Sequence, residues 1–155
     1  MQQIKCQCEC GNVELTLTEA PRARFYCHCE FCQEVYQKPY ADVTVVKSGT
    51  VEVNDESAID YRNYTPNVNR GVCKNCGRPI IARMTKMSSI VMIPAYSYQN
   101  SEGISEADLP EPKAHLYYHR KQAEVDDSVK KVNGPVRSQL KAMGIVVSGL
   151  LRRQK

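Results

Sequence analysis

Eight cysteines are the residues of this sequence with the clearest chemistry, and all of them lie in its first half. They form three tight clusters that read C-x-C-x-C, C-x-C-x-x-C and C-x-x-C. The N-terminal residues lack the apolar core of a signal peptide, so the expected compartment is the cytoplasm. Clustered thiols in such a chain are typical of metal sites and not of disulfides. We therefore expect the cysteines to bind zinc.

The first and third clusters predict one closed zinc site. Each contains a pair that ends in Cys-Gly, within Cys8-Glu9-Cys10-Gly11 and Cys73-Lys74-Asn75-Cys76-Gly77. A glycine after the second thiolate permits a tight turn with positive φ. Four thiolates give the tetrahedral set of a structural zinc, which contributes on the order of 10 kcal/mol to folding. Cys6 stays an open alternative, because on a strand Cys6, Cys8 and Cys10 would lie on one face and any two could bind metal.

The middle cluster predicts a different kind of site. Cys27, Cys29 and Cys32 offer three thiols within six residues. Three protein ligands and one open position are the arrangement of a catalytic zinc, and a zinc-bound thiol is deprotonated. The alternative is a second structural zinc, closed by Cys6, His28, His115 or His119. If the segment is extended, the His28 side chain points away from Cys27 and Cys29.

The elements that position these cysteines are predicted to be mainly strands. Valine outnumbers leucine 16 to 7, and there are 9 tyrosines, a bias typical of β structure. Apolar or alternating runs predict strands at residues 13–17, 40–46, 50–53, 59–64, 68–72, 80–84, 90–93 and 115–118. Hairpin turns are expected at residues 47–49 and 65–67. Residues 96–113 predict a long loop with a short helical turn at 105–109.

The C-terminal segment differs from the rest. Residues 121–155 contain eight basic and three acidic residues, whereas residues 1–120 are almost neutral. After Pro135, apolar residues recur at helical spacing as Val136, Leu140, Met143, Val147 and Leu150. We expect a domain over residues 1–132 and a basic amphipathic helix over residues 133–155 that docks on a sheet through this stripe. A dimerisation helix and a membrane-surface helix are the alternatives.

Three motifs together resemble the glutathione-dependent formaldehyde-activating enzyme family, which also includes centromere protein V. They are Cys8-Glu9-Cys10-Gly11-Asn12-Val13, then Cys27-His28-Cys29-Glu30-Phe31-Cys32, then Arg70-Gly71-Val72-Cys73-Lys74-Asn75-Cys76-Gly77-Arg78-Pro79-Ile80. The resemblance covers about residues 3–120 and implies a β-tent, two layers of antiparallel sheet stapled by zinc. It also implies two zinc ions. One is structural, on Cys8, Cys10, Cys73 and Cys76, and one is exchangeable and catalytic, on Cys27, Cys29 and Cys32.

The resemblance implies a carbon–sulfur lyase that joins formaldehyde and glutathione to give S-hydroxymethylglutathione. Its partners would be a glutathione-like thiol and a small aldehyde. Zinc in the open site would ionise the thiol or polarise the aldehyde oxygen. Lys38, Arg62 or Arg70 would receive the glutathione carboxylates. Nucleic acid is not an expected partner, no membrane span is expected, and the oligomeric state is open, with a homodimer as one possibility.

Two other functions compete with this one. The first is a non-catalytic, zinc-stapled module that binds a protein or nucleic acid through the basic C-terminal helix. An exposed apolar stripe on that helix, or a fourth ligand that closes the Cys27/Cys29/Cys32 site, would favour it. The second is zinc storage or redox sensing, in which oxidation of the thiolates releases the metal.

Overall fold

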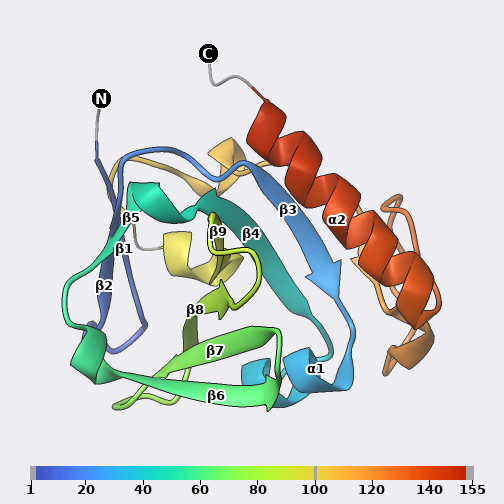
Figure 1. Ribbon diagram of the computed structural model, residues 1–155, viewed down its shortest axis with the longest axis horizontal. Helices are drawn as coiled ribbons and strands as arrows, with labels where there is room; N and C mark the ends of the chain where they lie inside the picture. The colour runs from blue at the N-terminus through green and yellow to red at the C-terminus, as the bar shows by residue number, and fades with distance from the viewer. Residues whose placement is uncertain (1–2, 100, 153–155) are drawn as a thin grey trace.

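Two β-sheets form the framework of the computed structural model, which describes residues 3–99 and 101–152 (Figure 1). The small sheet has the strand order β1-β2-β5, and the large sheet has the order β10-β3-β4-β9-β8-β7-β6. The strands are β1 Ile4–Gln7, β2 Glu14–Leu17, β3 Ala23–Cys27, β4 Ala41–Lys47, β5 Val51–Val53, β6 Ile59–Thr65, β7 Val68–Cys73, β8 Pro79–Met84, β9 Ile90–Pro94 and β10 His115–Leu116. The predicted fold class, mainly β with a C-terminal helix, is confirmed.

The helices are few and mostly short. The α-helices are α1 Glu30–Tyr36 and α2 Pro135–Leu151. Five 3₁₀ helices connect the strands: Ser48–Thr50, Glu56–Ala58, Ala95–Tyr98, Glu106–Asp108 and Tyr118–Arg120. The predicted helical turn at residues 105–109 is confirmed by the fourth of these. No helix among the described residues is long and apolar enough to cross a membrane.

The pairing of the strands confirms one predicted hairpin and contradicts another. Strands β6 and β7 pair around residues 66–67 as expected. The predicted hairpin across residues 47–49 is wrong, because β4 pairs with β3 and β9 in the large sheet while β5 pairs with β2 in the small one. Val43, Val45 and Val46 are all buried. A strand buried on both faces fits the centre of a sheet, and the 3₁₀ turn after β4 carries the chain across to the other sheet.

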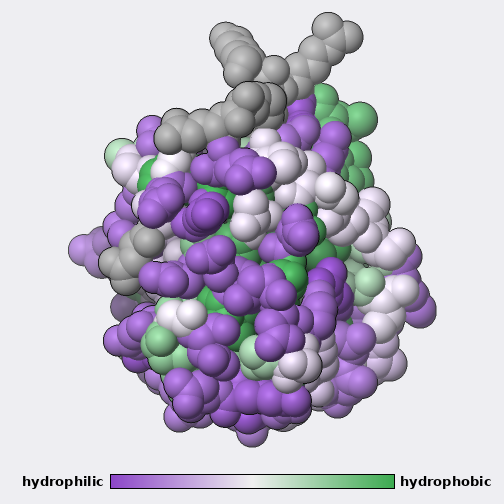
Figure 2. Space-filling model, turned by 90° about the vertical axis from the view of Figure 1, so that its left-hand side faces the viewer, coloured by the Kyte–Doolittle hydropathy of each residue, from purple (hydrophilic) through white to green (hydrophobic). Residues whose placement is uncertain are grey.

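Two other features of the sheets differ from the expectation. Strand β3 was not predicted from its sequence, and it holds the first cysteine of the middle cluster. The last strand, β10, is shorter than residues 115–118 and runs parallel to β3, so the large sheet is not wholly antiparallel. Figure 2 views the molecule from the side of the small sheet, where the surface is mainly hydrophilic.

Helix α2 forms where it was predicted, but it docks through a different face. Ser138, Ile145, Val146 and Gly149 are buried. The exposed large apolar residues of α2 are Val136 (69%), Leu140 (66%), Met143 (56%), Val147 (46%) and Leu151 (78%). A Cβ atom on Gly149 would lie 3.2 Å from the Cβ atom of Ala23. Small side chains therefore let the helix approach β3 closely, and the predicted stripe faces outward, apart from the half-buried Leu150. The division of the chain at residues 132 and 133 stays a prediction, and residues 153–155 lie outside the described residues.

Gly71 on β7 and Gly144 on α2 provide a matched test of how tightly the protein is packed around each glycine. A Cβ atom on Gly71 would lie 2.7 Å from Ile59 Cγ2 and 2.9 Å from the Ile81 carbonyl oxygen. We expect Gly71→Ala to lower the free energy of unfolding by about 1–3 kcal/mol through overpacking. Gly144→Ala meets no atom within 4 Å and is expected to raise it by up to about 1 kcal/mol, because alanine favours a helix. Chemical denaturation of the zinc-loaded proteins measures both, and equal effects of the same sign would contradict the packing around β7.

Candidate metal centres

The first and third cysteine clusters meet in one compact group. The sulfur atoms of Cys8, Cys10, Cys73 and Cys76 all lie within 4.8 Å of one another. The Sγ–Sγ distances are 3.4 Å for Cys8–Cys10, 3.7 Å for Cys8–Cys73 and 3.6 Å for Cys10–Cys73. A tetrahedral zinc with bonds of about 2.3 Å needs sulfur atoms about 3.8 Å apart. The four thiols therefore fit zinc with little movement.

Glycine turns give this quartet its shape. Gly11 has a φ of 77° and Gly77 a φ of 73°, which confirms the positive φ predicted after each second cysteine. The backbone N–H of Val13 donates to Cys8 Sγ at 3.3 Å. The pKa of Cys10 is lowered to about 6, mainly by a hydrogen bond with the Asn75 side chain. The quartet links the segment after β1 to the turn between β7 and β8, more than 60 residues later.

The middle cluster forms a second group at the start of α1. Cys27 ends β3, Cys29 is the N-cap of α1, and Cys32 lies in its first turn, with their sulfur atoms within 4.8 Å of one another. The thiols of Cys27 and Cys32 hydrogen-bond to Cys29 and lower its pKa, and the backbone N–H of Cys32 adds to this effect. Among the described residues, no fourth Cys, His, Asp or Glu joins this trio. Three sulfur donors are enough to bind zinc and leave one position open.

The trio borders a cavity of about 470 Å³. Cys29 and Cys32 line it, together with Arg70 and Phe31. The Arg70 guanidinium lies 5.8 Å from the centre of the Phe31 ring, and its Nη1 is buried without a hydrogen-bond partner. A half-buried guanidinium whose Nη1 group is buried and unpaired, beside reactive thiols, is suited to binding an anion.

The other two predicted carboxylate-binding residues do not line this cavity. The Lys38 ammonium lies 5.2 Å from the centre of the Tyr96 ring, and Arg62 pairs with Asp60 at 3.4 Å on an exposed surface. Of the three candidates, the structure places Arg70 alone beside the trio.

Sequence reasoning missed a chain of three polar residues that joins two buried histidines to Asp127. His28 Nε2 lies 2.8 Å from His115 Nδ1, and His115 Nε2 lies 2.8 Å from Asp127 Oδ2. Both rings are almost fully buried, and burial, followed by the charge on His115, lowers the pKa of His28 to about 4. These contacts hold His28 toward β10, so neither histidine closes the metal site. The three residues are far apart in sequence, and no spacing signal joins them.

Cys6 lies outside both groups and is 1% exposed. Burial, followed by the charge on Glu14, raises the pKa of its thiol to about 12. A protonated, buried thiol is inert toward alkylating reagents. In the zinc-loaded protein at pH 8 we expect iodoacetamide to leave Cys6 unmodified until denaturant is added. Rapid modification of Cys6 in the native protein, detected by peptide mass mapping, would contradict this placement.

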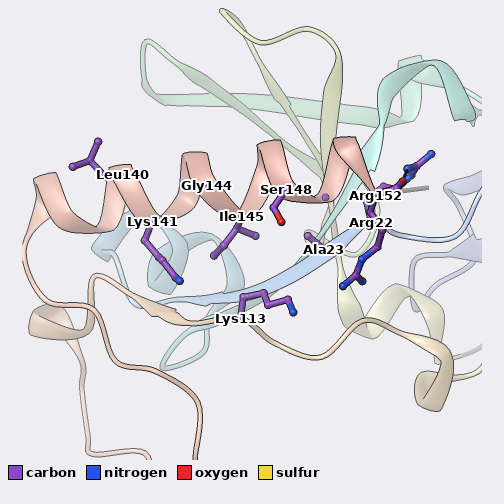
Figure 3. Close-up of a pocket in the computed structure, with 10 residues that line it drawn as sticks. Arg22, Ala23, Lys113, Leu140, Lys141, Gly144, Ile145, Ser148 and Arg152 are labelled. Atoms are coloured by element: carbon purple, nitrogen blue, oxygen red, sulfur yellow. Dashed lines mark hydrogen bonds between the residues drawn. The ribbon is translucent and has the colours of Figure 1, made fainter. Parts of the chain in front are cut away.

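A second hollow, of about 380 Å³, lies between α2 and the start of β3 (Figure 3). Figure 3 shows the side chains of Lys113 and Lys141 extending into the space beside α2. Arg22 donates through Nη1 to the carbonyl oxygen of Arg152 and through Nη2 to Glu19 at 2.8 Å. A cation at the end of a helix satisfies its last carbonyl groups and its dipole. Arg22 therefore anchors the end of α2, and no cysteine lines this hollow.

The protein is a cysteine-rich β protein suited to binding zinc. It combines two sheets with a four-thiol group and with a three-thiol group beside a cavity. The chain belongs to the glutathione-dependent formaldehyde-activating enzyme family, which it matches over residues 3–120. A crystal structure of a Rhodobacter sphaeroides protein has a similar fold, with a TM-score of 0.54 and 19% sequence identity over 70% of this chain and 96% of that chain. None of the curated proteins matches the sequence. Helix α2 lies outside the matched residues.

Proposed function

We propose that this protein is a zinc-dependent enzyme of the carbon–sulfur lyase type. It acts on adducts of glutathione, or a similar thiol, with a small aldehyde such as formaldehyde. The observation that carries the proposal is the three-thiol group that borders a cavity and has Arg70 beside it. Family membership supports the same reaction class. The expected compartment is the cytoplasm.

The two cysteine groups have separate roles in this proposal. Cys8, Cys10, Cys73 and Cys76 hold a structural zinc that joins the segment after β1 to the turn between β7 and β8. Cys27, Cys29 and Cys32 hold an exchangeable zinc at the reaction site. When bound there, zinc supplies a Lewis acid that ionises a thiol or polarises a carbonyl oxygen. Arg70 binds a carboxylate of the thiol substrate, and the wall of the cavity excludes water from the reacting groups.

The reaction needs no oxidant or reductant. In the synthetic direction, the substrate sulfur forms a bond to the aldehyde carbon, and the C=O double bond becomes a single bond. The thiol proton ends on the former carbonyl oxygen. The reverse reaction breaks the carbon–sulfur bond and returns that proton to sulfur.

The competing binding module has one observation in its favour, the outward-facing apolar stripe of α2. The second feature expected of it is not seen, because no fourth residue closes the trio among the described residues. The binding module also leaves the cavity beside the trio without a role. We therefore place the enzyme first.

The test is exchange of [¹³C]formaldehyde with glutathione, followed by NMR on the zinc-loaded protein. We expect Arg70→Gln to raise the KM for glutathione about tenfold or more, since a charge-assisted hydrogen bond to a carboxylate is lost. Arg137→Gln serves as the matched control, because Arg137 is exposed and lies outside the cavity. A wild-type protein that leaves the exchange at its uncatalysed rate, both with formaldehyde and with larger aldehydes up to hexanal, would contradict the proposed function.

A further inference from the structure

We propose that the cavity beside the trio binds the hydrocarbon part of an apolar aldehyde, either a medium-length aliphatic chain or an aromatic ring. This inference rests on the proposed function and narrows its substrate class. The thiol adducts of such aldehydes, and not those of formaldehyde, are then the preferred substrates.

The size of the cavity is the first argument. Its volume of about 470 Å³ lies in the range of pockets that enclose ligands of drug size, roughly 300–1,000 Å³. At about 30 Å³ for each water molecule in the liquid, it has room for on the order of fifteen waters. Formaldehyde has two heavy atoms and would leave most of this space empty. A substrate that fills the cavity needs a side group several carbon atoms long.

The chemistry of the wall is the second argument. Four methionines line it from separate parts of the structure: Met84 on β8, Met87 after β8, Met92 on β9 and Met143 on α2. Aliphatic and aromatic side chains fill much of the rest, with the polar Thr65, Asn67, Lys86 and Gln139 among them, and none of the described acidic residues lines the cavity. Methionine is flexible and polarisable, and it adapts to apolar groups of varied shape. This wall is suited to hydrocarbon and unsuited to the many polar groups of glutathione.

Thiols and a guanidinium lie together at one end of the cavity, and we expect this pairing to orient the substrate. Cys29, Cys32 and Arg70 lie together at that end. The reacting sulfur and an anionic group of the thiol substrate bind at this end of the cavity, because the cysteine thiols and the Arg70 guanidinium lie at this end. The carbon chain of the aldehyde is left to extend along the methionine wall. The chemical step is unchanged: a carbon–sulfur bond forms, and the thiol proton ends on the aldehyde oxygen.

Helix α2 is the third argument. Gln139, Ala142, Met143 and Val146 of this helix line the cavity. The family match ends at residue 120, before the helix begins. One wall of the cavity therefore comes from a segment outside the part of the chain that defines the family. A wall contributed by α2 changes which substrate fits the cavity, while the trio stays the same.

The test compares the binding of S-methylglutathione and S-hexylglutathione to the zinc-loaded protein. These stable thioethers carry an alkyl group where the aldehyde carbon would be bonded. Calorimetry gives the affinities, and ¹³C-labelled methionine methyl groups report contact with the cavity. Each buried methylene strengthens binding about fourfold. Five additional methylenes should therefore strengthen it by roughly 10²–10³-fold and shift the signals of Met84, Met87, Met92 and Met143.

Two variants on α2 distinguish the contribution of the cavity to binding from that of the rest of the helix surface. Met143→Gln should weaken S-hexylglutathione binding about fivefold and leave S-methylglutathione unchanged. Leu140→Gln is the matched control, because Leu140 is also exposed on α2 but does not line this cavity. Its affinities should stay within about twofold of the wild type.

The outcomes distinguish this inference from the proposed function. Equal affinities for the two thioethers, with formaldehyde–glutathione exchange intact, would overturn the apolar substrate class alone. Exchange at the uncatalysed rate with every aldehyde from formaldehyde to hexanal would overturn the proposed function, and this inference with it. Faster exchange with hexanal than with formaldehyde, together with the expected methionine shifts, supports both.

Discussion

Replacing Cys73 by serine is expected to remove one zinc ion and to abolish cooperative folding at physiological temperature. A structural zinc contributes on the order of 10 kcal/mol or more, which is comparable with the whole stability of a typical domain, about 5–15 kcal/mol. For a chain of this size each 1 kcal/mol corresponds to roughly 2–4 °C in Tm, so a fall of at least about 20 °C is expected. Metal analysis and calorimetric melting of the purified Cys73→Ser protein measure the two effects.

Cys6 offers a matched control for that experiment. Cys6 and Cys73 are each 1% exposed, and both belong to the same hydrophobic cluster. We expect Cys6→Ala to keep both zinc ions and to lose only about 1–2 kcal/mol, from a small cavity. If Cys6→Ala and Cys73→Ser lowered Tm equally, the quartet would have no special role in stability.

The second large effect is expected at the trio. Cys29→Ser should reduce the zinc content from two ions to one and lower the rate of formaldehyde–glutathione exchange by about 10³-fold, since the reaction site loses its Lewis acid. The fold should persist, because the quartet is untouched and Cys29 is only half-buried. Metal analysis, circular dichroism and the NMR exchange assay measure the three quantities.

The contrast between the two serine variants is the informative result. Cys73→Ser should act on stability, and Cys29→Ser should act on metal content and rate with Tm within about 5 °C of the wild type. A Cys29→Ser protein that keeps both zinc ions and full exchange would contradict the role proposed for the trio. A Cys29→Ser protein that fails to fold would show that the trio is structural.

The trio and each half of the quartet could be predicted because the geometry within each of them is local. In Cys8-Glu9-Cys10-Gly11 and Cys73-Lys74-Asn75-Cys76-Gly77, the short spacing brings each pair of thiols together, and the glycines adopt the positive φ that the turns need. The hairpin of β6 and β7 and the position of α2 are local features of the same kind. Their residues interact with near neighbours, so the pattern of residue types is enough.

Features that depend on distant residues could not be predicted in this way. The sequence around residues 47–49 does not indicate that β4 and β5 join different sheets. The partners of β4 are β3 and β9, and the partner of β5 is β2, all of which lie elsewhere in the sequence. The face on which α2 docks is set by the close approach of Gly149 to Ala23. The stripe of large apolar residues had predicted that α2 docks through a different face.

The cavity is the largest feature that the sequence did not reveal. Its wall combines Phe31 on α1, Arg70 on β7, Met92 on β9 and Met143 on α2, and the first and last of these are more than a hundred residues apart in sequence. The same holds for the hydrogen-bonded chain of His28, His115 and Asp127. Only the assembled sheets bring such residues together.

The most direct test of the central claim is native mass spectrometry of the protein purified without chelator, with and without glutathione. The account predicts two zinc ions per chain and a glutathione adduct that disappears in Cys29→Ser. Two zinc ions with no adduct would mean that the trio holds a closed metal site, and this result would contradict the proposed reaction.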